Sequence, residues 1–148
     1  MNASNLDKLA TYLEALPENY AHFNMGVYLT VRYYSAVAAE WVYAQNPQAL
    51  IHECGTVACA LGHGPAAGVP ALATSHLGIE WYDYAILQFV DEESDQFDWL
   101  FSGSWGDIDN TPHGAAKRIR YLLADKEIPT DLMQRLSNFD RSLIDLYA

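Results

Sequence analysis

The run Thr56-Val57-Ala58-Cys59-Ala60-Leu61-Gly62-His63 carries small or apolar side chains at nearly every position. A helix that is apolar on nearly every face is usually buried, and small side chains let neighbouring elements approach closely. We therefore predict that residues 56–63 form the central helix of the fold. Two glycines and two prolines in residues 64–70 predict that the chain leaves this helix through a loop.

Apolar residues recur at helical spacing in four other segments, which are residues 6–16, 80–90, 112–123 and 130–146. A further helix is expected over residues 35–45. Residues 27–34 are rich in β-branched and aromatic side chains and fit either a short strand or a short helix. Residues 103–110 are expected to form a loop.

The ends of several helices can also be assigned. Ser4 or Asn5 can cap the first helix, and Pro17 ends it. Thr111 followed by Pro112 is the strongest helix start in the chain, because threonine caps well and proline suits the first turn. The last helix is expected to begin at Thr130 or Asp131. These patterns predict a mainly α, single compact domain over residues 1–148. They indicate about five to seven helices around the small-residue central helix, with room for a short strand pair.

The composition excludes some classes of function. The chain has 148 residues, 51% of them hydrophobic, so it can bury a sizeable core without a disulfide or a metal. Nineteen acidic residues against eight basic ones give a net charge of −11. This charge argues against direct binding of nucleic-acid phosphates and against docking on anionic membranes. It favours a soluble protein, or one that meets a partner with a basic surface.

The sequence predicts a cytoplasmic protein. The first residues lack a basic stretch followed by an apolar run, which a secretory signal would need. Residues 57–73 are too interrupted by glycine and proline to span a bilayer. The two cysteines, Cys54 and Cys59, do not make a disulfide scaffold, so both thiols are expected to be reduced.

Two histidines and two cysteines lie within twelve residues, and they are His52, Cys54, Cys59 and His63. Zinc takes these ligand types in tetrahedral sites, and a helix would place Cys59 and His63 on one face. The spacing is not that of a common zinc finger or knuckle. The alternative is that the cysteines pack as small hydrophobes. We favour this structural interpretation, in which Gly55 and Gly62 permit close packing beside Thr56. It predicts no bound zinc and a buried Cys59.

A second alternative makes Cys54 a nucleophile, because a helix that begins just after it would lower the pKa of the thiol. His113 or His63 could serve as its base. Three residues could orient that base, namely Asp107, Asp109 and Asn110. Cysteine hydrolases of the papain kind pair such a helix with a β-sheet, and this chain offers little strand pattern. We therefore predict that the chain is not an enzyme.

Two other clusters each allow two interpretations. Asp107 and Asp109 beside His113 could bind a metal or transfer protons, but acids ahead of Thr-Pro more often form turns and caps, and we favour capping. The second cluster is basic, and its members are Lys117, Arg118 and Arg120. It could hold a phosphate-bearing small ligand. An exposed face paired to neighbouring acids is the simpler interpretation, and it is the one we expect.

The most acidic stretch of the chain is the candidate interaction surface. Its residues are Asp91, Glu92, Glu93, Asp95 and Asp98, with Asp107 and Asp109 downstream. Interfaces commonly join an aromatic anchor to a charged rim, so we expect Trp105 or Tyr82 to supply the anchor. In the alternative interpretation the acids only keep the protein soluble, while Trp99 and Phe101 belong to the core. The first interpretation predicts binding of a partner protein with a basic surface.

Residues 54–62 also resemble a known motif. The order Cys54, Gly55, Thr56, Cys59, Gly62 resembles the Cys-Gly-Thr-x-x-Cys-x-x-Gly signature of a family of small phage and prophage proteins. Residues 6–13 and 99–119 are similar to other parts of the same proteins. The resemblance implies a phage origin and a protein that binds and inhibits or redirects a host protein, for example one of antiviral defence. The alternatives are a binding protein for a nucleotide-like small ligand and, less favoured, an enzyme that depends on zinc or a thiol.

Overall fold

Seven helical segments and one pair of short strands make up the part of the chain that the computed structural model describes, residues 1–26, 30–31, 56–70 and 80–148. The helices are α1 (Ala3–Glu14), α4 (Trp81–Gln88), α5 (Gln96–Phe101), α6 (Trp105–Ile108), α7 (Pro112–Leu123), α8 (Leu132–Ser137) and the 3-10 helix η1 (Arg141–Leu146). The strands are β1 (Thr30–Val31) and β2 (Thr56–Val57). The predicted mainly α fold is confirmed. The helix expected over residues 35–45 lies outside the described residues.

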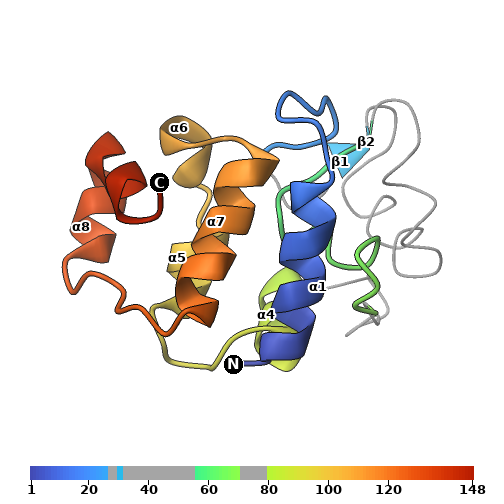
Figure 1. Ribbon diagram of the computed structural model, residues 1–148, viewed down its shortest axis with the longest axis horizontal. Helices are drawn as coiled ribbons and strands as arrows, with labels where there is room; N and C mark the ends of the chain where they lie inside the picture. Colours follow the sequence, from blue (N-terminus) through green and yellow to red (C-terminus); the bar gives the residue numbers. More distant parts are fainter. Residues whose placement is uncertain (27–29, 32–55, 71–79) are drawn as a thin grey trace.

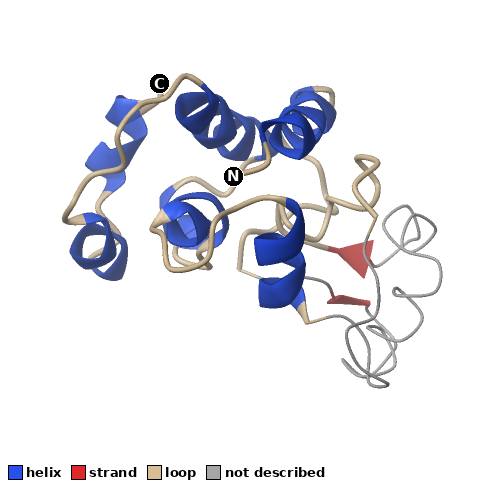
Figure 2. Cartoon of the chain, turned by 90° about the horizontal axis from the view of Figure 1, so that it is seen from below, coloured by secondary structure: helices blue, strands red, loops and turns tan. Residues whose placement is uncertain are grey.

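The strands form a minimal antiparallel ladder. Thr30 stands opposite Val57, and Val31 stands opposite Thr56. In two views of the chain the ladder lies at the end of the molecule opposite α8 (Figure 1, Figure 2).

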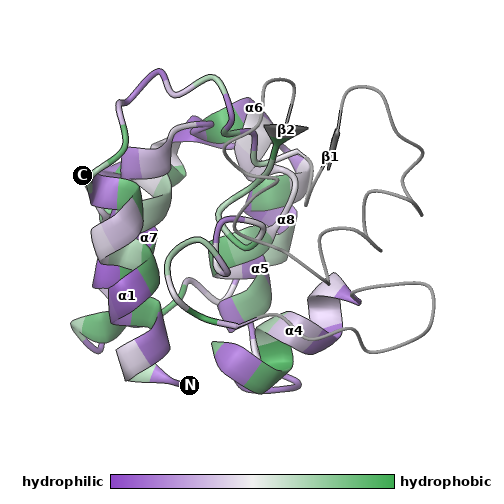
Figure 3. Ribbon diagram, turned by 90° about the vertical axis from the view of Figure 1, so that its right-hand side faces the viewer, coloured by the Kyte–Doolittle hydropathy of each residue, from purple (hydrophilic) through white to green (hydrophobic). Residues whose placement is uncertain are grey.

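Helices α1 and α7 run side by side (Figure 1) and carry hydrophobic and hydrophilic residues on different faces (Figure 3). The side chain of Asn2, rather than that of Ser4 or Asn5, caps α1 by accepting from the Asn5 amide at 3.1 Å. In α7 the predicted cap is confirmed, because Thr111 Oγ1 accepts from the Gly114 amide at 2.9 Å. Local capping therefore begins both helices of this pair.

Residues 56–63 do not form the predicted central helix. Thr56 and Val57 form β2, and residues 60–68 are a series of turns. The backbone of Ala58 bonds to another segment, donating to the His22 carbonyl at 2.9 Å and accepting from the Asn24 amide at 3.0 Å. These bonds replace the ones that a helix would make. The predicted central position is nevertheless correct, since every residue from 58 to 65 is buried.

Two further corrections concern the bounds and type of predicted segments. Residues 103–110 contain the one-turn helix α6 rather than only a loop. The helix expected over residues 130–146 ends at Ser137, because Phe139 adopts a left-handed φ of 49° that an α-helix cannot continue. As a result Leu132, Leu136 and Leu143 are buried, whereas three other apolar residues of the predicted stripe are exposed, namely Met133, Phe139 and Leu146.

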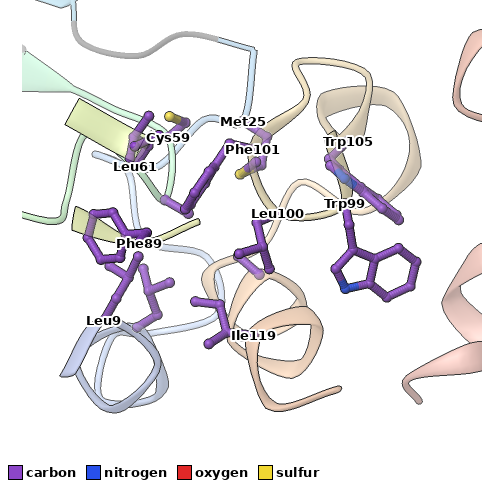
Figure 4. Packing of buried hydrophobic residues seen from close by; sticks show 14 of the residues in the cluster. Leu9, Met25, Cys59, Leu61, Phe89, Trp99, Leu100, Phe101, Trp105 and Ile119 are labelled. Carbon is purple, nitrogen blue, oxygen red and sulfur yellow. The ribbon is translucent and has the colours of Figure 1, made fainter. Parts of the chain in front are cut away.

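One continuous core joins these elements (Figure 4). Trp99 and Trp105 lie in it with their rings perpendicular and their centroids 5.7 Å apart. Each indole N–H is satisfied, that of Trp99 by the Arg118 carbonyl and that of Trp105 by the Asp98 carbonyl, both at 3.1 Å. Phe101 is buried with them, so the core interpretation of Trp99 and Phe101 is confirmed. Within the described ranges, no helix has the length and apolar character needed to cross a membrane.

Candidate functional site

The acidic stretch lies between α4 and α5 and extends into α5. Asp91, Glu92, Glu93 and Asp95 are exposed, whereas Asp98 is half-buried, and burial together with the nearby charge of Asp95 raises the pKa of its carboxyl. Asp91 pairs with the N-terminal ammonium of Met1, and the hydrogen bond from that ammonium lowers the pKa of Asp91. Glu92, Glu93 and Asp95 are therefore the acids of this stretch that face solvent without an ion pair to a described residue.

Part of this stretch forms one wall of a groove of about 430 Å³. Leu122 and Ile128 supply apolar surface to the groove, and three carboxylates stand around it, those of Asp95, Asp125 and Glu127. We call this feature the acidic groove. Its remaining lining residues are Met1, Ser94, Gln96, Lys126 and Thr130. A volume of this size lies within the range of about 300–1,000 Å³ that is typical of ligand pockets.

Sequence reasoning missed Asp125 and Glu127. They follow α7 and lie about thirty residues from Asp95 along the chain, so only the tertiary fold brings them to the same groove. The available signal was their charge, because both are acidic residues just beyond a well-defined helix.

The two predicted aromatic anchors differ in position. Trp105 is fully buried, so the prediction that it anchors a partner at the surface is wrong. Tyr82 is 49% exposed and packs edge-on against the half-buried ring of Phe97, with ring centroids 5.0 Å apart. Phe97 lies within α5, two residues after Asp95, so Tyr82 presents an aromatic surface beside the acidic stretch.

The predicted partner surface also includes Asp107 and Asp109, and these two residues differ in exposure. Asp107 is exposed. Asp109 instead accepts hydrogen bonds from Tyr147 Oη and Thr111 Oγ1, both at 2.8 Å, and its carboxylate lies 3.7 Å from the Arg118 guanidinium. Asp109 is thus an internal structural residue, which contradicts its assignment to the partner surface. Thr111, and not Asp107 or Asp109, caps α7, so the prediction that these acids act as caps is not confirmed.

The predicted basic face is only partly exposed. Arg120 pairs with Glu14 at 2.8 Å and with Asp7, as expected for a cation matched to neighbouring acids. Arg118, in contrast, is fully buried, with its guanidinium carbon 4.0 Å from the centre of a Trp105 ring. Burial lowers the pKa of Arg118, while Tyr147 and Asp109 oppose that shift. The prediction of an exposed Arg118 is wrong.

The histidine–cysteine cluster is described only in part, because His52, Cys54 and Gly55 lie outside the described residues. Cys59 and His63 are both fully buried. The His63 ring stacks on Phe23 with centroids 5.8 Å apart, and its Nε2 lies 3.0 Å from the His22 carbonyl oxygen. Residues 59–63 are not helical, so no helix aligns Cys59 with His63.

Among the residues whose placement is described, no three histidine, cysteine or acidic side chains gather as a metal site would require. One of the two candidate bases is His113. Its Nε2 lies 2.7 Å from the Leu16 carbonyl oxygen, at hydrogen-bonding distance. The zinc and nucleophile alternatives both depend on Cys54, so they stay hypotheses.

Replacing Cys59 by serine is expected to destabilise the protein by about 1–3 kcal/mol, because a buried hydroxyl would replace a sulfur that packs as an apolar atom. Urea denaturation measures this change. Burial also raises the pKa of the Cys59 thiol to about 11. Little thiolate therefore exists at neutral pH, and a thiol reagent should modify Cys59 only on unfolding. Rapid modification of Cys59 in the native protein would contradict its structural role.

No family model, no curated protein and no solved structure matches this chain.

Proposed function

We propose that this chain is an interaction protein that uses the acidic groove to bind a basic surface of a partner protein. The observation that carries the proposal is the make-up of the groove, where the carboxylates of Asp95, Asp125 and Glu127 outnumber the two cationic groups of Met1 and Lys126 around apolar surface. Lysine and arginine side chains combine an aliphatic stem with a charged head. The stem of such a side chain would lie on Leu122 and Ile128 while its head meets the carboxylates.

The rest of the surface supports the same kind of partner. The net charge of −11 attracts a basic protein from a distance and speeds encounter at low salt. Tyr82, half-exposed beside Phe97, offers an aromatic contact of the kind that is common at interface centres. In this proposal the acids steer the approach and the aromatic pair contributes apolar contact.

The resemblance to small phage and prophage proteins suggests the origin of the partner. A phage protein of this kind acts in the cytoplasm of the bacterial host. We therefore propose that the partner is a host protein, for example one of antiviral defence, whose activity is inhibited or redirected by binding.

A matched pair of charge-reversal variants tests this function. Glu92→Lys with Asp95→Lys alters the acidic stretch, and Glu18→Lys with Asp145→Lys alters exposed acids after α1 and in η1. Each reversal raises the charge by two, so both double variants change the net charge from −11 to −7. They differ in location and not in total charge.

Partners are captured from host lysate at low salt and identified by mass spectrometry, and association rates are then measured with the purified partner. We expect the Glu92/Asp95 variant to associate about tenfold more slowly than the Glu18/Asp145 variant at low ionic strength. The difference should shrink near 0.1 M salt, where the screening length is about 10 Å. Equal association rates for the two variants at low salt would show that the acidic stretch, including the Asp95 wall of the groove, does not meet the partner.

A further inference from the structure

A second hollow in the molecule is lined by basic rather than acidic residues. Four of the eight basic residues of the chain lie within residues 117–126. Three of them, Lys117, Arg120 and Lys126, line one hollow of about 160 Å³, which we call the basic hollow. Its other lining residues are Tyr121, Ala124 and Tyr147. The chain has a net charge of −11, so this local concentration of cations makes the hollow a candidate site for binding an anion.

The cations of the basic hollow differ in whether their charge is already paired with a carboxylate. Arg120 is held by Glu14 and Asp7, so its charge is already matched. Lys117 and Lys126 are exposed, and neither forms an ion pair with any carboxylate in the described part of the chain. The Lys126 ammonium lies 5.3 Å from the centre of the Tyr121 ring. Two ammonium groups are thus without an ion pair among the described residues, and Lys126 lies at the border between the basic hollow and the acidic groove that Asp125 and Glu127 line.

A third positive charge lies behind the wall of the hollow. The guanidinium of Arg118 is 5.7 Å from the centre of the Tyr147 ring and donates from Nη1 to Tyr147 Oη at 3.4 Å. Arg118 is completely buried, and its Nε and Nη2 have no hydrogen-bond partner among the described residues. Its nearest carboxylate, that of Asp109, lies 3.7 Å away. This buried charge, which Asp109 matches only in part, adds positive potential near the Tyr147 ring.

The tyrosines present rings rather than free hydroxyls. Tyr121 Oη donates to the Glu127 carbonyl at 2.6 Å, and Tyr147 Oη donates to Asp109 at 2.8 Å. Both hydroxyls are therefore engaged. The half-buried ring of Tyr121 and the 8% of Tyr147 that is exposed form walls beside the two lysines. An anionic group that carries a small apolar or aromatic part would find charge and apolar surface together.

We infer that the basic hollow binds a small phosphomonoester, with the phosphate between Lys117 and Lys126 and the organic part against Tyr121 and Tyr147. A volume of about 160 Å³ is below the usual range for larger ligands, so the site suits one phosphate with a small substituent rather than a whole nucleotide. Lysine is a common phosphate binder because it is a compact point charge. This inference does not rest on the proposed binding of a basic protein.

Titration with inorganic phosphate and with phenyl phosphate, each compared with potassium chloride at matched ionic strength, tests the site. The tyrosine ring signals in NMR spectra report binding, and calorimetry gives the dissociation constants. We expect both phosphates to shift the Tyr121 and Tyr147 signals, with phenyl phosphate binding more tightly. Lys117→Gln should weaken phosphate binding about tenfold, and so should Lys126→Gln, through loss of one charge-assisted contact.

Lys8→Gln is the matched control, because Lys8 is an exposed lysine of α1 that does not line the hollow. It removes the same charge and should leave the dissociation constants unchanged. The inference is overturned if chloride produces the same shifts as phosphate, or if Lys117→Gln binds phosphate as well as Lys8→Gln does. Phenyl phosphate binding no more tightly than inorganic phosphate would overturn the assignment to an organic phosphomonoester. Both lysines are exposed, so the variants should fold.

Discussion

Replacing Asp109 by alanine is expected to lower the free energy of unfolding by about 3–5 kcal/mol, because it removes the nearest carboxylate from a fully buried arginine. Among the described residues, Arg118 would keep the weak 3.4 Å contact with Tyr147 Oη and the contact with the Trp105 ring. The substitution also leaves the Tyr147 and Thr111 hydroxyls without their acceptor. One substitution thus breaks an ion pair and two hydrogen bonds that join α6, α7 and the end of η1.

Asp107→Ala provides the control for this measurement. Asp107 lies two residues away and is exposed in α6, so its loss removes the same charge from the chain without disturbing a buried group. We expect its effect to stay within about 0.5 kcal/mol. Urea denaturation of both variants decides the question. Similar stabilities for Asp109→Ala and Asp107→Ala would mean that the Arg118 charge is accommodated without Asp109.

The sequence predicts those helices whose signals are local. Helix α7 follows from Thr111 and Pro112 at its start and from a buried stripe that includes Ile119 and Leu122. Helix α1 follows in the same way from its leucine spacing, although the cap is Asn2. In both cases the residues that specify the helix lie within it or next to it, so a reader of the sequence has all the information.

Residues 56–63 show where local reading fails. Their small apolar composition correctly predicts burial, because burial depends on side-chain chemistry. It does not predict the backbone, because the carbonyl and amide of Ala58 bond to residues 22–24. That pairing is a tertiary event with no local pattern. The same small residues would suit a buried helix, so composition alone could not separate the two outcomes.

Arg118 and the acidic groove are the corresponding failures at the level of sites. Arg118 stands between two other basic residues in the sequence, where an exposed face is the normal expectation, yet its partners come from Trp105, Asp109 and Tyr147. The groove likewise needs Asp125 and Glu127 to meet Asp95 across the fold. Charge runs indicate which residues are available, and only the packing of helices decides which of them meet.

Gly114→Ala is expected to cost at least ~2 kcal/mol, although alanine is normally the better helix former. Gly114 lies in the first turn of α7, and an added Cβ would come closer than 3.0 Å to Cγ and both carboxylate oxygens of Asp109. Asp109 is short and is held by Thr111 and Tyr147, so it can move only by giving up those bonds. Gly103→Ala is the control, because a Cβ there meets no atom within 4 Å.

A double-mutant cycle separates this mechanism from a general intolerance of Gly114 to substitution. Once Asp109 is alanine, the carboxyl group that collides with the new Cβ is gone. Gly114→Ala should then stabilise the Asp109→Ala protein by up to about 1 kcal/mol, through the ordinary advantage of alanine over glycine in a helix. The effect of one substitution therefore changes sign with the background, and the coupling is measured by urea denaturation of the four proteins. If Gly114→Ala destabilises both backgrounds equally, its cost comes from the backbone or from other neighbours. In that case a collision with the Asp109 carboxyl group is not the reason that position 114 requires glycine.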